Sequence, residues 1–143
     1  MSTIEEFERQ VMTALLAGND PLLEALRAQY NAASVSDREL TRRGFVTRFD
    51  VPDSAPAIDR ELLHLDDLQV ELEGAETPVD AVLSVENGLL QSLECSVYEG
   101  EFPETPSITA AWYYGTARFP AINQELLAAR HLDELFEEDD DEE

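Results

Sequence analysis

The spacing of the apolar residues changes along this chain, and that change limits the folds open to it. In residues 4–33 apolar side chains recur every three or four positions, which is the period of an amphipathic helix. From residue 45 they alternate with polar side chains, which is the period of a half-buried strand. A helical pattern returns at residues 120–136. This order predicts an α+β domain with helices against one face of an antiparallel sheet.

Two helices are marked at their ends. Ser2 or Thr3 provides a cap, and a glutamate three residues later completes a capping box. Gly18 is a natural stop for this helix. The second helix begins at Asp20-Pro21, a cap followed by proline at the first helical position, and fades near Ala33. Because the link between them is short, we expect the two helices to pack antiparallel.

Alternation after residue 44 predicts an antiparallel sheet of about four to five strands. The expected strands are residues 45–51, 68–72 and 108–114, together with two strands of a hairpin over residues 79–98. Residues 62–65 are ambiguous, and residues 36–39 fit a further helical turn. We expect one domain over residues 1–136, followed by a disordered acidic tail over residues 137–143.

The sequence around Asn87-Gly88 indicates the clearest hairpin, and its register decides which side chains are buried. A two-residue turn pairs Glu86 with Leu89 and mixes apolar and charged residues on each face. A three-residue loop with a left-handed glycine pairs Val85 with Leu89 instead. One face then holds Ala81, Leu83, Val85, Leu89, Leu93, Cys95 and Val97, with Gln91 as its polar member. Because a one-residue slip exchanges the two faces, this cleaner pattern predicts the three-residue loop.

The chain is strongly acidic, with 32 Asp and Glu residues, nine arginines and no lysine, for a formal net charge of −23. Residues 137–143 contain seven of the acids. The excess is not confined to that run, because residues 61–105 hold twelve acids and no basic residue. Residues 37–60, in contrast, hold five acids and five arginines. Such a charge repels nucleic acid and anionic membranes and attracts basic protein surfaces.

Two interpretations of this charge stay open. In proteins of salt-loving organisms, a carboxylate-rich surface keeps the protein hydrated, and the acidity then has no specific target. In the other interpretation, the acids form a surface that meets a basic protein partner.

Residues with catalytic or metal-binding chemistry are few. His64 and His131 have no second nitrogen or sulfur ligand at a usable spacing, and no glycine-rich loop has phosphate-binding spacing. Cys95 falls on the predicted apolar face, where a core role is favoured over that of a nucleophile. We therefore expect no catalytic residue, no metal and no cofactor. A single cysteine, an N-terminus unlike a secretory signal and no long apolar run favour a cytoplasmic protein.

Exposed acids and aromatic residues are the candidates for binding a partner. In the segment Trp112-Tyr113-Tyr114, the first and third residues share one face of a strand, and one face is expected in the core. If the other face is exposed, Tyr113 becomes an interface anchor, as does Phe102 in its acidic loop. The predicted partner-binding residues are Glu71, Glu73, Glu94, Tyr98, Glu99, Glu101, Phe102, Glu104 and Tyr113.

Several motifs carry a resemblance to a known group of proteins. The run DPLLEALRAQY from Asp20 is followed by RELT from Arg38 and GFVTRFDVP from Gly44, and looser matches continue through VLSVENG to residue 98. With these motifs the chain resembles a group of small uncharacterised bacterial α+β proteins, mainly over residues 20–98. It departs from their pattern at Thr77-Pro78-Val79. The resemblance implies a single bacterial α+β domain and carries no assigned activity.

The leading hypothesis is a non-enzymatic acidic interaction protein that binds a basic protein partner. Its concrete form is an immunity or inhibitor protein against a nucleic-acid-acting toxin, whose phosphate-binding surface an acidic protein can occupy. A nucleic-acid mimic is the stronger form and requires carboxylates spaced like duplex phosphates. The alternatives are an acidic housekeeping domain of a salt-adapted bacterium, or a small ligand-binding protein or enzyme with a pocket between sheet and helices.

Overall fold

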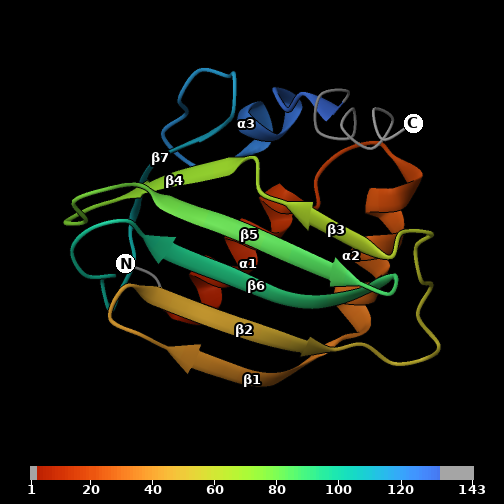
Figure 1. Ribbon diagram of the computed structural model, residues 1–143. Helices are drawn as coiled ribbons and strands as arrows, with labels where there is room; N and C mark the ends of the chain where they lie inside the picture. Colours follow the sequence, from red (N-terminus) through yellow and green to blue (C-terminus); the bar gives the residue numbers. More distant parts are fainter. Residues whose placement is uncertain (1–2, 133–143) are drawn as a thin grey trace.

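Residues 3–132, the part of the chain that the computed structural model describes, form three helices and a seven-stranded antiparallel sheet (Figure 1). The elements are α1 (Ile4–Leu15), α2 (Pro21–Ala32), β1 (Ser34–Leu40), β2 (Gly44–Asp50), β3 (Leu62–Leu65), β4 (Leu68–Leu72), β5 (Val79–Glu86), β6 (Leu89–Val97), β7 (Ile108–Tyr113) and α3 (Gln124–Ala128). The predicted α+β class is confirmed, and the predicted four to five strands are too few. The acidic tail predicted at residues 137–143 lies outside the described residues.

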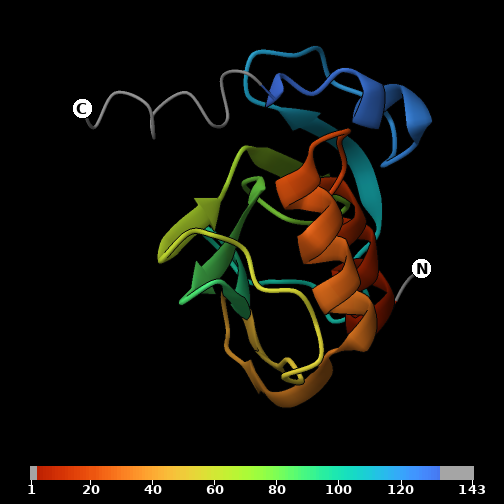
Figure 2. The same cartoon turned by 90° about the vertical axis from the view of Figure 1, so that its right-hand side faces the viewer.

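Both N-terminal helices begin where their capping signals stand. The Thr3 hydroxyl accepts from the Glu6 N–H at 3.1 Å, and the Glu6 carboxylate accepts from the Thr3 N–H at 3.0 Å, which completes the capping box. The Asp20 carboxylate accepts from the Leu22 N–H at 2.9 Å at the start of α2. The two helices run antiparallel and cover the same face of the sheet (Figure 2). Over residues 3–132, no helix is long and apolar enough to cross a membrane.

The sheet has the strand order β1-β2-β6-β5-β4-β7, and β3 pairs with β5 beside that path. Because β5 and β6 lie in the middle, their inward side chains pack beneath the helices; these are Val79, Ala81, Leu83, Val85, Leu90, Leu93, Cys95 and Val97. None of the three described helices covers the opposite face of the sheet (Figure 2). It carries polar and charged side chains such as Arg48, His64 and Glu94, which are exposed.

The β5–β6 hairpin corrects the predicted register. Asn87 and Gly88 have φ values of 55° and 81°, so the connection is the two-residue turn in which both central residues are left-handed. Glu86 pairs with Leu89 across this turn, and the predicted three-residue loop is wrong.

A β-bulge explains why the predicted buried face is nevertheless nearly right. Val85 pairs with Leu90 and Ser84 with Ser92, so Gln91 is the extra residue on β6. The bulge shifts the alternation by one residue and brings Leu93 opposite Leu83 on the core side. Leu90, which is 2% exposed, takes the place predicted for Leu89.

Two short segments also depart from the prediction. Residues 36–39, which fit a helical turn, belong to β1, an exposed edge strand whose register shifts between Val35 and Asp37. Of the helix predicted over residues 120–136, the described residues contain the short helix α3, whose cap is Asn123. The Asn123 side chain accepts from the Leu126 N–H at 3.0 Å.

A buried arginine joins the C-terminal segment to the rest of the domain. The Arg130 guanidinium donates from Nε and Nη2 to the two oxygens of Asp67, at 2.9 and 2.7 Å. Its Nη1 donates to the carbonyls of Ala14, Leu15 and Ala17 at 2.8–3.2 Å, so it also satisfies the C-terminal end of α1. Its carbon Cζ lies 4.9 Å from the ring centroid of Tyr113.

Candidate functional site

Two loops gather acidic side chains at one end of the sheet. The β4–β5 loop, residues 73–78, lies beside the β6–β7 loop, residues 98–107, at the left of Figure 1. The Thr77 hydroxyl accepts from the N–H groups of Tyr98 and Glu99 at 3.0 and 3.3 Å. The Glu73 N–H donates to the Ser107 carbonyl at 2.9 Å. These hydrogen bonds hold the two loops together as one surface, which we call the end-loop surface.

The end-loop surface has an aromatic residue among exposed carboxylates. Tyr98 is 78% exposed. The exposed acids are Glu73, Glu76, Glu99, Glu101 and Glu104. Glu101 forms an ion pair with Arg42 at 3.3 Å, whereas the other four acids pair with no basic residue of the described part. The surface is therefore anionic and carries an amphipathic side chain suited to an interface.

Arginines of the described residues are engaged by carboxylates and backbone carbonyls of the same chain, and Arg42 and Arg43 do so at the edge of the end-loop surface. Ion pairs with carboxylates of the described residues are formed by Arg38, Arg42, Arg48, Arg118 and Arg130. Arg27 and Arg43 donate to backbone carbonyls at the end of α1 and at Tyr98. Because these contacts engage the positive charges internally, the unpaired carboxylates dominate the surface.

Of the remaining predicted partner-binding residues, Glu71 lines a hollow together with Glu76 and Thr77 next to the end-loop surface, whereas Glu94 lies in the middle of β6. Glu71 and Glu94 lie on the uncovered face of the sheet, where Glu71 pairs with Arg118. Phe102 packs against Phe7 and Phe45, with ring centroids 5.7 Å apart in both cases, so the expectation that it is an exposed anchor is wrong. It instead holds its loop on the core.

Tyr113 is also a correction, because it is 1% exposed and cannot act as a surface anchor. Its hydroxyl donates to the Ala14 carbonyl at 2.6 Å. Burial raises its pKa, the nearby Arg130 lowers it, and Asp67 raises it. The core face of β7 is therefore the face of Tyr113, and Trp112 lies on the other face, where the Arg118 guanidinium carbon is 4.6 Å from its ring.

Sequence reasoning missed Glu76, whose carboxylate lies against the backbone of Gly100. The strand order provides the missing signal. When β5 lies between β4 and β6, the loop after β4 and the loop after β6 emerge at the same end of the antiparallel sheet. Their glutamates then belong to one surface.

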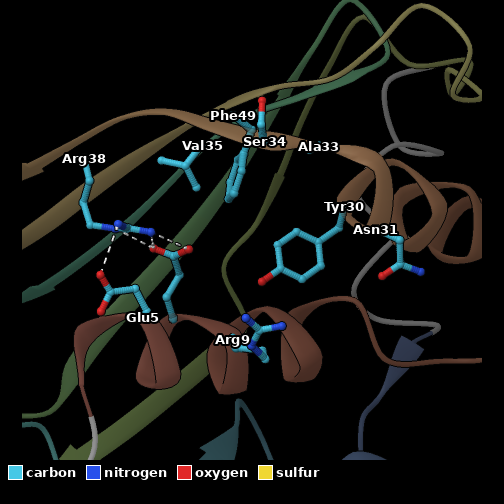
Figure 3. A pocket seen from close by; sticks show the side chains of 10 residues that line it. Glu5, Arg9, Tyr30, Asn31, Ala33, Ser34, Val35, Arg38 and Phe49 are labelled. Atoms are coloured by element: carbon cyan, nitrogen blue, oxygen red, sulfur yellow. Dashed lines mark hydrogen bonds and ion pairs between the residues drawn. The ribbon is translucent and has the colours of Figure 1, made fainter.

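A second candidate site is a cavity of about 300 Å³ between α1, the end of α2 and strands β1 and β2, which we call the α1–β1 pocket (Figure 3). At its base, Glu8 is 4% exposed. The Thr47 hydroxyl donates to Glu8 at 2.5 Å, and the Arg38 guanidinium donates to both Glu8 oxygens at 3.1 and 3.2 Å. This buried carboxylate is therefore fully paired. In the sequence, Glu8 could have been recognised as a charged residue within the apolar stripe of α1.

The other groups with reactive chemistry are not assembled into a site. Cys95 is buried, and burial, with smaller contributions from Glu8 and Glu94, raises the pKa of its thiol well above the ordinary value. His64 is exposed on β3. Within residues 3–132, no three His, Cys, Asp or Glu side chains lie together as a metal site.

Comparisons with known proteins add no assignment. No protein-family model, no curated protein and no solved structure matches this chain. The resemblance to small bacterial α+β proteins therefore stays a prediction.

Proposed function

We propose that this chain is a non-enzymatic acidic interaction protein that binds a basic protein partner through the end-loop surface. The observation that carries the proposal is the distribution of charge around Tyr98. Four carboxylates there pair with no described basic residue, while the two arginines beside them, Arg42 and Arg43, are engaged by Glu101 and by the Tyr98 carbonyl.

The physical chemistry of such a surface favours fast and salt-sensitive association. Unpaired carboxylates steer a basic surface toward the loops over a distance of about one Debye length, roughly 8 Å at physiological salt. Tyr98 then supplies apolar contact area with a hydroxyl at its tip, and tyrosine is enriched among residues that dominate binding energy. Charge sets the rate of encounter, and the aromatic contact slows dissociation.

The specific partner that we propose is a nucleic-acid-acting toxin, with this chain as its immunity or inhibitor protein. Enzymes that cleave nucleic acid hold phosphates with Lys and Arg, and an anionic protein surface competes for those same groups. A basic surface of that kind complements the end-loop carboxylates in sign.

The test compares two variants with the same change in charge. In the first, Glu73, Glu76, Glu99 and Glu104 of the end-loop surface are changed to Gln. In the matched control, exposed acids distant in sequence from both loops are changed to their amides: Glu24, Asp53, Glu86 and Glu125. Basic proteins captured by the immobilised wild-type chain from a bacterial lysate are identified, and the dissociation constant of the tightest is measured with each variant at several salt concentrations.

We expect the end-loop variant to bind the partner at least about tenfold more weakly, and the dissociation constant of the control to change by less than about threefold. The affinity of the wild-type chain is expected to fall steeply as salt rises. Tyr98→Ala is expected to weaken binding by about 30-fold, as for a central aromatic contact. Equal losses in the two charge variants, or binding that does not respond to salt, contradict the proposal and favour acidity that serves hydration alone.

A further inference from the structure

Arg9 stands out in a chain so rich in acids. It lies on α1 one turn after Glu5, which is the spacing at which a glutamate and an arginine usually pair. Glu5 lies instead 3.6 Å from Arg38, and Arg9 makes no hydrogen bond or ion pair within residues 3–132. Arg9 is exposed and lines the α1–β1 pocket, so its guanidinium is open to a ligand that enters the pocket.

A second donor lies beside it. The Tyr30 hydroxyl points into the α1–β1 pocket toward α1, with the Arg9 guanidinium beneath it (Figure 3). This hydroxyl has no hydrogen-bond partner in the described part of the chain, and its ring packs edge-on against Phe49 at 5.9 Å. Burial and then Glu8 raise the pKa of Tyr30, whereas Arg9 and Arg38 lower it, so the hydroxyl keeps its proton at neutral pH. Arg9 and Tyr30 thus offer N–H and O–H donors to the same space.

The other end of the pocket has the opposite character. Glu8 is fully used by Arg38 and Thr47, but Glu5 is exposed and contacts Arg38 only at 3.6 Å. One carboxylate of the pocket is therefore available to a cation. The side chains of Val35 and Phe49 form an apolar part of the wall between the two polar ends.

We propose that the α1–β1 pocket binds a small zwitterion, an α-amino acid with an apolar side chain. Its carboxylate accepts hydrogen bonds from Arg9 and Tyr30, its ammonium group donates to Glu5, and its side chain lies against Val35 and Phe49. Glu5 and Arg9 are one helical turn apart, and residues at that spacing have Cβ atoms about 5–6 Å apart. This short separation suits a ligand whose ammonium and carboxylate groups are attached to the same carbon. A site with both a carboxylate and a guanidinium matches this pair of charges.

The charge of the whole chain supports a zwitterion over a simple anion. A protein of net charge −23 repels a free carboxylate ion, and this field opposes binding at any local donor. A zwitterion has no net charge, so the repulsion on its carboxylate is offset by attraction of its ammonium group. The pocket volume of about 300 Å³ lies at the lower end of the range for small-molecule sites.

The experiment titrates the full-length chain with three probes and follows amide signals by NMR. L-Leucine has both charges, N-acetyl-L-leucine lacks the ammonium group, and L-leucinamide lacks the carboxylate. We expect L-leucine to shift the amides of Arg9, Tyr30 and Val35, and each blocked probe to bind at least about tenfold more weakly, since a hydrogen bond to a charged group is lost.

Three variants locate the site. Arg9→Gln is expected to weaken L-leucine binding by about tenfold or more, and Tyr30→Phe by about threefold to tenfold. Arg42→Gln makes the same charge change at the end-loop surface and leaves the affinity unchanged. Three results overturn the proposal. The first is an absence of amide shifts at 10 mM L-leucine, a concentration that reaches about the weakest binding worth assigning to a site. The others are equal binding of a blocked probe and full binding of L-leucine by a folded Arg9→Gln protein.

Discussion

Replacing Arg130 with Met tests whether this buried arginine holds the domain together. The substitution keeps a long unbranched side chain but removes five hydrogen bonds, two to Asp67 and three to carbonyls at the end of α1. It leaves the Asp67 carboxylate, 14% exposed, without its partner. Breaking a buried ion pair from one side costs about 3–5 kcal/mol. We expect that loss here, because the Arg130 side chain is 1% exposed.

The assay is urea unfolding followed by circular dichroism. With an m value of about 2 kcal/mol/M, a loss of about 4 kcal/mol lowers the midpoint by about 2 M. Since domains of this size have total stabilities of about 5–15 kcal/mol, the variant stays folded at 25 °C unless the wild type is near the lower limit. Arg130→Lys is expected to lie between the two, because an ammonium group cannot reproduce the planar five-donor geometry.

Two companion variants show whether the reasoning is correct. Arg118→Met removes an exposed arginine that pairs with Glu71 and lies over Trp112, and it is expected to cost less than about 1 kcal/mol. Adding Asp67→Asn to Arg130→Met removes the unpaired charge and is expected to recover part of the loss. A cost below 1 kcal/mol for Arg130→Met, or no recovery in the double variant, refutes a buried pair as the source of stability.

Two further predictions concern the core and the hairpin. Gly88→Ala places a Cβ 2.5 Å from the Ile58 carbonyl oxygen at a φ of 81°, whereas Gly74→Ala meets nothing within 4 Å at a φ of 84°. We expect about 1 kcal/mol from conformation alone at Gly74 and at least 2 kcal/mol at Gly88, measured by urea unfolding. Burial raises the pKa of Tyr113 above its unfolded value of about 10, so its contribution to stability is complete below pH 10 and is lost as pH rises further. Tyr113→Phe should lose about 1 kcal/mol at pH 7 and reduce the decline in unfolding free energy between pH 10 and 11; an unchanged decline contradicts this assignment.

Local signals in the sequence were sufficient for the two N-terminal helices. The capping box at Thr3 and the Asp20-Pro21 start are each satisfied by atoms within three residues, so no tertiary contact is needed to recognise them. β1 has no such signal. It is an exposed edge strand without apolar alternation, and its pairing with β2 depends on a neighbour that the pattern of its own residues does not reveal.

The hairpin shows how a correct pattern can lead to a wrong turn. The alternation in β5 and β6 required a shift of one residue, and we placed that shift in the loop. The chain places it at Gln91, where a bulge costs a single unpaired residue and leaves the favoured Asn87-Gly88 turn intact. Burial patterns determine how many residues must be inserted, but not where the insertion occurs.

The candidate site was only partly predictable for the same physical reason. The acids of the end-loop surface stand out in the composition, but their convergence depends on strand order. The buried pair of Arg130 with Asp67 joins residues 63 positions apart, and neither side chain interrupts an otherwise apolar run. The exposure of an aromatic residue is equally non-local: Phe102 lies in an acidic, proline-rich loop, yet it packs on Phe7 from α1.

The arrangement of charge gives folding and binding opposite responses to salt. The folded chain concentrates its net negative charge in a small volume, so added salt screens this repulsion and is expected to raise the free energy of unfolding. Arg130 with Asp67 is buried and is screened much less, so that pair does not reverse the trend. The end-loop carboxylates attract a basic partner through solvent, and the same salt weakens that attraction. A protein whose acidity served hydration alone would show only the first response, because it would have no complex to weaken.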